Sequence, residues 1–547
     1  MSRPAPWVKP MAELKRPLAE ESPAGSDSSV EPLATGPASG GSRVGRAPGM
    51  VTRLLDRLNE QEIAYCRWQG DEHLQAETAA PQGLDILVDR QDALRVAVIL
   101  AEAGFKRAVA AALLPDPGGE HHYLALEEDC GSIVQLHLRY NLAIGDERLS
   151  EYRLPWEPLV LSTRRLDQQA GMYVADPSVE FLFLLVQVAF DLRLGSLVRH
   201  RLGAPWCCPR RLREVHWRLR GDAGPVADLS RRLLGAAAAD LVSEMVAGEP
   251  SFTKVREFRR CAVPVVHNYR LYRRGGARWR RSWRALCVVA RNLSRGLARS
   301  RRPEGRMVPS GGVAIAFLGS DGSGKSTLLV ETMAWLSGSL RTVPIYFGSG
   351  VGPSSVLRWP LLQAERLLRK RMPSVRDRPW RRSTGPTSSL RARLSRSLWA
   401  AARLVWAVAL AYEKRGKLHA LTRARNRGLV VVCDRYPQNQ FQDFNDGPML
   451  GRWRDHPWRL LRAVAEWEGT PYRWAEHVVP DLVLKLHVRP DVAQRRKPDM
   501  QLQELEKRAE AIRGLRFPDV TETVDIDAEE PLEQVVRRIR RCVWRKI

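Results

Sequence analysis

The sequence predicts an α/β protein with more than one domain, whose C-terminal part contains a parallel β-sheet. Three observations lead to this prediction. The chain has 547 residues, which is too long for a single hydrophobic core. A strand-like apolar run over residues 313–318 leads directly into a glycine-rich loop. After residue 311, apolar runs alternate with helix-like stretches, as in parallel strands that are joined by helical crossovers.

Composition and cysteine usage narrow the class of protein. Hydrophobic residues make up 44% and charged residues 27% of the chain, as in ordinary globular proteins. The eight cysteines contain no C-x-x-C pair, so they support neither a zinc site nor a disulfide framework. Since the N-terminus also lacks an apolar signal segment, we expect a cytoplasmic protein. The apolar stretch 398–412 contains Arg403 and is too short to span a bilayer, so it predicts a buried core helix.

Composition divides the chain into four segments. Residues 1–48 are rich in Pro, Ser and Gly, which predicts a disordered tail. Residues 49–175 combine strand and helix patterns and predict a small α+β domain. Residues 176–310 are mostly helical and become strongly basic. Residues 311–547 contain the alternating pattern of the parallel-sheet domain.

Positive charge is concentrated in the helical segment. The net charge of the chain is +26, and residues 251–310 alone hold 17 basic residues against 2 acidic ones. Apolar side chains recur there at helical spacing, with arginines largely on the other faces: Trp279, Trp283, Leu286, Ala290, Leu293 and Leu297. Three explanations stay open. The helix packs between domains, or it lies on an anionic membrane surface at the inner face of the membrane, or, less favoured, it contacts nucleic acid.

The C-terminal segment shows a parallel sheet most clearly. Its strand candidates are residues 313–318, 343–347, 429–433, 482–488 and 523–526. Runs that are apolar on both faces, such as residues 429–432, indicate a sheet that is covered by helices on both sides. Ligands of such sheets bind at the carboxyl ends of the strands, so we expect functional residues there.

The loop after the first of these strands has the phosphate-binding (P-loop) pattern. Its sequence is Gly319-Ser320-Asp321-Gly322-Ser323-Gly324-Lys325-Ser326-Thr327. Glycines let backbone N–H groups converge on phosphate oxygens, and the helix that starts there adds its positive end. Lys325 would reach the outer phosphates, and the Ser326 hydroxyl would hold Mg²⁺. The alternative, a Gly/Ser-rich loop with a chance lysine, does not account for the strand before it.

Further charged residues follow neighbouring strands. Asp434 and Arg435 come directly after residues 429–433, where a carboxylate can hold Mg²⁺ through water and an arginine can clamp a second phosphate. The alternative is a strand that simply ends in a charged pair. Asp321 would repel phosphate, so it is expected to accept a hydrogen bond from an acceptor sugar hydroxyl. Arg495 and Arg496, followed by Lys497, either close over the transferring phosphoryl group or begin a solvated helix.

These motifs together resemble thymidylate kinase over residues 311–547. The resemblance rests on the loop, on Val431-Val432-Cys433-Asp434-Arg435-Tyr436 and on Pro480-Asp481-Leu482-Val483-Leu484-Lys485-Leu486. It implies a nucleoside monophosphate kinase fold with strand order 2-3-1-4-5. It also implies ATP and Mg²⁺ at Lys325 and Ser326, with an acceptor sugar at Asp321 and its phosphate at Arg435. Arg495 and Arg496 would be lid cations.

The acceptor side departs from the thymidylate kinase pattern. The family has an Arg-Glu-Pro stretch after the second strand, where this chain has Phe347-Gly348-Ser349-Gly350-Val351-Gly352-Pro353-Ser354-Ser355. It has Ser and Tyr-Gln residues after the Asp-Arg pair, where this chain has Pro437-Gln438-Asn439-Gln440-Phe441-Gln442. The chain looks closest to the thymidylate-kinase-like proteins of bacterial surface-polysaccharide gene clusters. Its acceptor is therefore left open.

The N-terminal segment resembles a minimal nucleotidyltransferase domain. The resemblance rests on Tyr65-Cys66-Arg67-Trp68 and Gly83-Leu84-Asp85-Ile86-Leu87-Val88-Asp89, with strands over residues 84–88 and 133–138. Such enzymes bridge two metal ions with carboxylates on neighbouring strands. Here Gly83 and Gln135 stand at two of these positions and only Asp85 remains, so we expect a fold without metal catalysis. A strand-end role for Asp85 is the alternative.

Three functions follow as hypotheses. The first is ATP-dependent phosphoryl transfer to a nucleoside monophosphate (dTMP-like) or a related phosphomonoester. The second is a non-catalytic or regulatory ATP-binding scaffold of polysaccharide assembly. The third is a bifunctional kinase and nucleotidyltransferase that uses Asp85. A phosphorylated small-molecule acceptor is the expected partner, and a homodimer is one candidate assembly.

Overall fold

The structure is a computed structural model of the chain. It describes residues 49–68, 83–110, 119–146, 149–192, 208–219, 222–297, 305–348, 390–442, 446–498 and 500–547. The expected tail 1–48 and residues 349–355 lie outside the described part. Residues 47–348 and 411–547 belong to one unit, and residues 390–410 are the described part of another.

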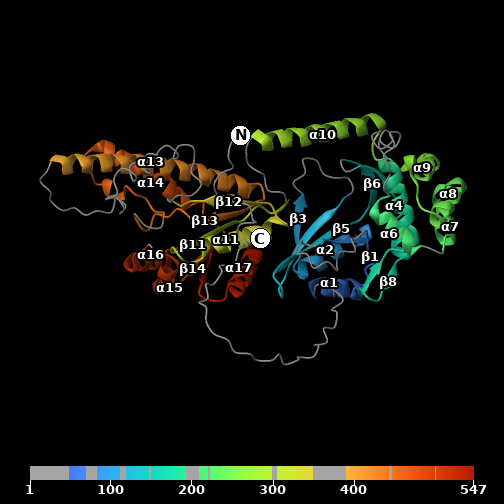
Figure 1. The fold of residues 1–547 in the computed structure, drawn as a ribbon, viewed down its shortest axis with the longest axis horizontal. Coiled ribbons are helices and arrows are strands. Elements are labelled where there is room, and N and C mark those ends of the chain that lie inside the picture. Colours follow the sequence, from blue (N-terminus) through green and yellow to red (C-terminus); the bar gives the residue numbers. More distant parts are fainter. Residues whose placement is uncertain are drawn as a thin grey trace, which may run out of the picture. The chain divides into compact units, whose positions relative to one another are not determined.

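The N-terminal part contains an eight-stranded mixed sheet with the order β10-β3-β4-β5-β2-β1-β9-β8 (Figure 1). Its elements are α1 (Gly49–Glu60), β1 (Tyr65–Arg67), β2 (Gly83–Val88), η3 (Arg90–Asp92), α2 (Ala93–Glu102), β3 (Lys106–Ala110), β4 (His121–Glu127), β5 (Ser132–Arg139), β8 (Arg165–Asp167), β9 (Met172–Val174) and β10 (Arg306–Met307). The strands predicted at residues 84–88 and 133–138 are confirmed as β2 and β5, which lie side by side and parallel. Leu54 of α1 and Ile99 of α2 are buried in one core with these strands.

The helical segment packs in a second hydrophobic core, to which Cys66, Trp68 and Leu87 of the N-terminal sheet region also contribute. It contains α4 (Pro177–Asp191), α6 (Arg210–Arg218), α7 (Gly224–Leu234), α8 (Ala236–Ala247), α9 (Phe252–Val266), η4 (His267–Tyr269) and α10 (Arg274–Leu297). The hairpin of β6 (Leu142–Asp146) and β7 (Leu149–Leu154), with α3 (Glu157–Ser162), packs in the same core. Helix α4 is buried in this core, since Phe181, Leu182 and Leu185 have no exposed surface. No helix in the described part of the chain is long and apolar enough to cross a membrane.

The C-terminal part contains a five-stranded sheet in which every neighbouring pair is parallel. Its order is β12-β13-β11-β14-β15, which is 2-3-1-4-5 when the strands are numbered along the chain. The elements are β11 (Ala314–Gly319), α11 (Lys325–Ser337), β12 (Thr342–Tyr346), α13 (Leu390–Asn426), β13 (Val430–Asp434), η7 (Gly451–Trp453), α14 (Arg459–Ala475), β14 (Leu482–His487), α15 (Pro490–Arg496), α16 (Leu502–Gly514), β15 (Glu522–Asp527) and α17 (Leu532–Lys546). The mixed α/β class with a parallel sheet is thus confirmed.

Successive residues of the central strand enter two different cores. Ile315 and Phe317 pack on one face with side chains of α11 and α17. Ala316 and Leu318 pack on the other face with side chains of α13, α14 and α16. Because side chains alternate along a strand, a strand that is apolar at every position requires helices on both faces. This arrangement fixes the carboxyl ends of the strands along one edge, where the glycine-rich loop begins.

One expectation needs correction. Residues 398–412 are not a separate buried helix but part of α13, which extends from Leu390 to Asn426. Val405 and Tyr412 are at least half exposed, so this stretch is not buried all round. Beyond the charged stretch 413–417, Leu418 and Leu421 of the same helix pack under the sheet. Their spacing marks one buried stripe of a longer helix.

The buried position of Leu484 in β14 gives a stability test. Leu484→Ala removes a side chain with no exposed surface and leaves a cavity, so the free energy of unfolding should fall by about 2–5 kcal/mol. The matched control is Leu460→Ala, because Leu460 on α14 is 74% exposed, and its effect should stay within about 0.5 kcal/mol. Urea unfolding followed by circular dichroism measures both. Equal effects of the two substitutions would contradict the assigned core.

Candidate functional site

The glycine-rich loop is a tight turn whose glycines are required by close contacts. Gly322 and Gly324 have φ angles of 84° and 79°, in the left-handed region that favours glycine. A Cβ atom at Gly319 would lie 2.5 Å from Ser323 Oγ, and one at Gly322 would lie 2.7 Å from the Ala493 carbonyl oxygen. The loop therefore closes on itself and against α15 in a way that a side chain at either position would prevent.

Lys325 begins α11 and turns its side chain back into the loop. Its Nζ atom donates hydrogen bonds to the carbonyl oxygens of Gly319 (2.6 Å) and Ser320 (2.7 Å). The side chain is almost fully buried. Burial, followed by the nearby charge of Arg435, lowers the pKa of Lys325 to about 8. The loop thus holds an ammonium group whose charge is only partly compensated.

Asp434 and Arg435 lie at the end of the neighbouring strand, next to the loop. Asp434 is the partner of Phe317 in the register between β11 and β13. Arg435 adopts φ 67°, which is uncommon for a residue with a side chain and costs about 1–2 kcal/mol. Its N–H donates to the Phe317 carbonyl oxygen at 3.0 Å, which helps to hold this conformation. Backbone strain of this kind is typical of functional sites.

Asp321 is the acceptor for three basic side chains from three elements. Arg435 donates to one of its carboxylate oxygens at 3.3 Å, and Lys497 Nζ lies 3.6 Å from the same oxygen. Arg508 of α16 donates to the other oxygen. Burial alone would raise the pKa of Asp321, but Arg435, Arg508 and the nearby lysines hold it below its usual value. The loop is thereby tied to the end of β13 and to α16.

A second carboxylate holds the far side of Arg435. The Nη1 atom of Arg435 donates to Asp446 Oδ2 at 3.4 Å, and the side chain of Asp446 is almost fully buried. The charge of Asp446 raises the pKa of Arg435. The carbonyl oxygen of Asp446 accepts a hydrogen bond at 2.6 Å from Lys414, a fully buried lysine whose Nζ also lies over the ring of Tyr472. The Arg435 guanidinium is therefore fixed from both sides.

Asp434 has a carboxylate oxygen that is without a hydrogen-bond partner in the described part of the chain. Its Oδ1 atom is buried and accepts no hydrogen bond from the described residues. Burial raises the pKa of Asp434, although Arg435 and Lys325 act in the opposite direction. Ser326 and Thr327 lie exposed in the first turn of α11. A carboxylate oxygen and a serine hydroxyl at a glycine-rich loop are ligands of the kind that Mg²⁺ takes when it carries phosphate.

The predicted lid residues are placed differently from one another. Arg496 donates to the Gly322 carbonyl oxygen at 3.3 Å, so it lies against the loop. Arg495 pairs with Asp491 on α15 at 3.1 Å, and both side chains are well exposed. Lys497, the third residue of the cluster, approaches Asp321. The structure thus brings Lys325, Asp321, Asp434 and Arg435 together with Arg496 and Lys497, but not with Arg495.

Sequence reasoning missed three residues of this network: Arg508, Asp446 and Lys414. Arg508 has the i,i+4 spacing to Glu504 of an ordinary surface ion pair, to which it donates at 2.6 Å. Asp446 lies in a stretch without regular structure, at φ 67°. Lys414 offered the best signal, since a lysine within an apolar helical stripe needs a buried partner. None of the three stands in a recognisable motif.

The N-terminal sheet places Asp85 in a second polar cluster. Gly83 pairs with Gln135, and Asp85 pairs with His137, in the parallel register of β2 and β5. Asp85 Oδ1 lies 3.0 Å from His137 Nδ1, so Asp85 is not a solvated strand end. Asp89 accepts from the Gln91 N–H and caps the short helix η3, which gives it a structural role. Burial, with a smaller contribution from Arg306, lowers the pKa of the nearby His122 to about 4.

Comparison with known proteins supports a nucleotide-related site in general terms. No family model matches the sequence. The chain is 27% identical to "Uncharacterized ATP-binding protein YghR" of Escherichia coli strain K12. The alignment spans 232 residues, which are 42% of this chain and 86% of the relative. Over 235 residues, 42% of this chain and 91% of the relative, it is 26% identical to "Uncharacterized ATP-binding protein YghS" of the same strain. Both relatives are covered over most of their length.

The unmatched carboxylate gives a stability test. The pKa of Asp434 in the folded protein is raised above its ordinary value of 3.8. Ionisation of Asp434 therefore lowers the free energy of unfolding once the pH exceeds the pKa of this group in the unfolded chain. Asp434→Asn should therefore melt at a higher temperature than the unchanged protein at pH 7. The difference should shrink as the pH falls and vanish near pH 4. Asp519→Asn, at an exposed position, should show no such difference. A lower melting temperature of Asp434→Asn at pH 7 would contradict the assigned environment.

Proposed function

We propose that this chain catalyses ATP-dependent phosphoryl transfer to a nucleoside monophosphate or a related phosphomonoester. The proposal rests chiefly on one observation: Lys325, Asp434 and the Asp321–Arg435 pair converge at the carboxyl edge of a parallel sheet, around a loop that only glycines can form. The names of the two relatives, which describe ATP-binding proteins, support the ATP part of the proposal. The resemblance to thymidylate kinase and the 2-3-1-4-5 strand order support phosphoryl transfer.

Each residue has a role in this proposal. The loop N–H groups and Lys325 hold the outer phosphates of ATP, while Ser326 and Asp434 hold Mg²⁺. When bound, Mg²⁺ would neutralise part of the negative charge on the phosphate oxygens. Arg435 binds the acceptor phosphate with its planar guanidinium, which Asp321 and Asp446 orient from two sides. Arg496 stands at the loop as a lid cation, and Arg495 joins it only after leaving Asp491.

A second candidate function is a non-catalytic ATP-binding scaffold. The specific observation in its favour concerns Asp321, which the first proposal assigns to the acceptor sugar. Both of its oxygens already pair with arginines, one with Arg435 and the other with Arg508. A carboxylate so occupied can serve to fix the loop without receiving an acceptor. Such a protein would bind ATP and release no ADP in response to any acceptor.

Acceptor-dependent ADP release distinguishes the two candidates. The full chain should release ADP with at least one member of a panel of nucleoside monophosphates and sugar phosphates, dTMP included. Lys325→Ala should lower that rate at least about 100-fold, because it removes a cation from the transferring phosphates. Lys507→Ala, at an exposed position on α16, should leave it unchanged. Full activity of Lys325→Ala would overturn the proposal, and ATP binding without acceptor-dependent release would favour the scaffold.

The pKa of Lys325 predicts how nucleotide affinity depends on pH. Phosphates attract the protonated ammonium, which loses its proton above about pH 8 in the free protein. Binding must then take a proton up, so the affinity for ATP should fall about tenfold per pH unit above pH 8. Lys325→Arg keeps its charge and should show a flat profile over the same range. Isothermal titration calorimetry between pH 7 and 9.5 measures both.

An equal slope in both proteins would contradict the assignment of this titration to Lys325. The titrating group would then be another one, such as Lys414, whose pKa burial also lowers to about 8.

We also propose that α10 binds an anionic membrane surface. Its apolar side chains Trp279, Trp283 and Leu286 are largely exposed, and the two indole rings stack with centroids 6.0 Å apart. Exposed arginines, including Arg278 and Arg280, flank this stripe. Tryptophan beside arginine on one helix suits the boundary between lipid headgroups and acyl chains.

Vesicle sedimentation tests the membrane proposal. The full chain should sediment with vesicles of phosphatidylcholine and phosphatidylglycerol, and less so with phosphatidylcholine alone or at high salt. Replacing both Trp279 and Trp283 by alanine should weaken binding by about tenfold or more. Trp458→Ala, at another exposed tryptophan, is the matched control. Binding that needs only charge and is stronger for nucleic acid than for vesicles would overturn the proposal.

A further inference from the structure

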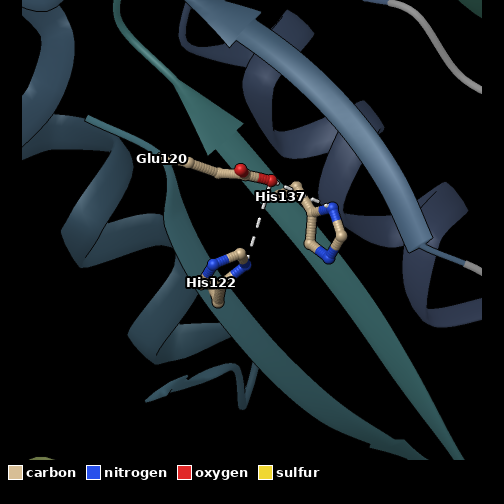
Figure 2. A group of neighbouring side chains, drawn as sticks. All are labelled: Glu120, His122 and His137. Carbon is tan, nitrogen blue, oxygen red and sulfur yellow. Dashed lines mark ion pairs between the residues drawn. The ribbon is translucent and has the colours of Figure 1, made fainter. Parts of the chain in front are cut away.

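The N-terminal sheet contains a group of side chains that the phosphoryl-transfer proposal does not use. Glu120, His122 and His137 each offer one ligand atom, and these atoms all lie within 4.8 Å of one another. Figure 2 shows the Glu120 carboxylate reaching to both imidazole rings. No cysteine contributes to the group. Nitrogen and oxygen donors in this proportion are typical of sites for Zn²⁺ and related divalent transition metals.

Strand register brings these residues together. His122 of β4 and His137 of β5 are direct partners in an antiparallel pair, so their side chains stand on the same face. Their rings meet edge to face, with centroids 4.9 Å apart. Asp85 of β2 is the partner of His137 on the other side, and Glu120 directly precedes β4. The group is therefore built on three adjacent strands rather than on a loose loop.

The distances suit one metal ion. Glu120 Oε1 lies 3.2 Å from His137 Nδ1 and 4.0 Å from His122 Nδ1. Ligand atoms at about 2.0–2.2 Å from a tetrahedral Zn²⁺ ion are about 3.3–3.6 Å from each other. The two distances from Glu120 Oε1 differ from these values by less than 1 Å, and all three ligand atoms lie within 4.8 Å of one another. Asp85 Oδ1, at 3.0 Å from His137 Nδ1, adds a second carboxylate at the same place.

Two further observations point to a ligand. The Nδ1 atom of His122 is buried and has no hydrogen-bond partner among the described residues. A buried imidazole nitrogen without a partner is costly, and a metal ion would satisfy it. Arg139 lies 3.5 Å from the second oxygen of Glu120, which orients the first oxygen toward the histidines. Such outer partners are typical of metal sites.

Arg306 of β10 opposes a metal ion at this place. It donates to His137 Nε2 at 2.8 Å and also to Gln135. Since a guanidinium only donates, His137 Nε2 must accept, and the ring hydrogen sits on Nδ1 between the carboxylates. A metal ion on Nδ1 takes the place of that hydrogen, and the ring then carries its hydrogen on Nε2. That hydrogen would face the donor of Arg306, so Arg306 must withdraw.

We propose that Glu120, His122 and His137, with Asp85 beside them, form a binding site for a divalent transition metal of the Zn²⁺ type, and that Arg306 is the competing cation.

The backbone of Arg306 is held by two residues that follow α11. Its N–H donates to the Ser339 carbonyl oxygen, and its own carbonyl oxygen accepts from the Arg341 N–H. The site is independent of the proposed phosphoryl transfer, because none of its ligands touches the glycine-rich loop.

Metal titration of the full chain tests the site. After dialysis against a chelator, the chain should bind one Zn²⁺ ion by calorimetry. With Co²⁺ it should show ligand-field absorption without the sulfur-to-cobalt charge-transfer band that cysteine ligands would give. His122→Ala should weaken binding at least about tenfold. His121→Ala is the matched control, since His121 is the adjacent histidine on β4 and packs against Tyr140 instead. Its affinity should be unchanged.

Two further variants keep the proposal falsifiable if His122→Ala does not fold. Glu120→Gln retains the shape of the side chain and should also weaken binding at least about tenfold. Arg306→Gln should strengthen binding severalfold, because the side-chain amide oxygen that the substitution introduces can accept the hydrogen on His137 Nε2. Absence of binding, equal loss in His121→Ala and His122→Ala, or weaker binding by Arg306→Gln would each overturn the proposal. In that case the group is a polar network in which Arg139 pairs with Glu120 and Arg306 donates to His137.

Discussion

The rest of the candidate site depends on the ion pairs that the Asp321 carboxylate makes with three basic side chains. This carboxylate lies inside the glycine-rich loop and pairs with Arg435, Arg508 and Lys497, which come from three different elements. An acid beside a phosphate site is unfavourable by itself, but three cations more than compensate for its charge. The same contacts bring Arg435 to the loop. One carboxylate thereby joins the end of β13, the middle of α16 and the loop into a single arrangement.

The sequence predicted the parallel sheet because its signals are local. Residues 314–318 and 430–433 are apolar at every position, and only helices on both faces bury such strands. The loop was equally predictable from its glycine pattern: Gly322 and Gly324 have left-handed φ angles, and a Cβ atom at Gly319 or Gly322 would meet close contacts. Helix length was less predictable. In α13, the apolar residues form a stripe of a long helix rather than a short buried one.

The site was predicted only in part, because half of it depends on tertiary contacts. Asp434 and Arg435 follow a strand directly, so their place at the sheet edge follows from the sequence. Arg508 reaches Asp321 from a distant segment, and Asp446 reaches Arg435 from a stretch without regular structure. Neither residue has a neighbouring motif. The histidine group of the N-terminal sheet was missed for the same reason. His122 and His137 become neighbours only through the register of β4 and β5.

In the proposed function, Lys325 and the glycine-rich loop bind phosphate beside Asp434. A crystal structure of the chain with Mg²⁺ and a non-hydrolysable ATP analogue tests it most directly. We expect the outer phosphates inside the loop, Lys325 Nζ moved from the Gly319 and Ser320 carbonyl oxygens onto them, and the metal ion next to Asp434 Oδ1. Nucleotide bound elsewhere, or Lys325 still donating to those carbonyl oxygens beside bound nucleotide, would contradict it.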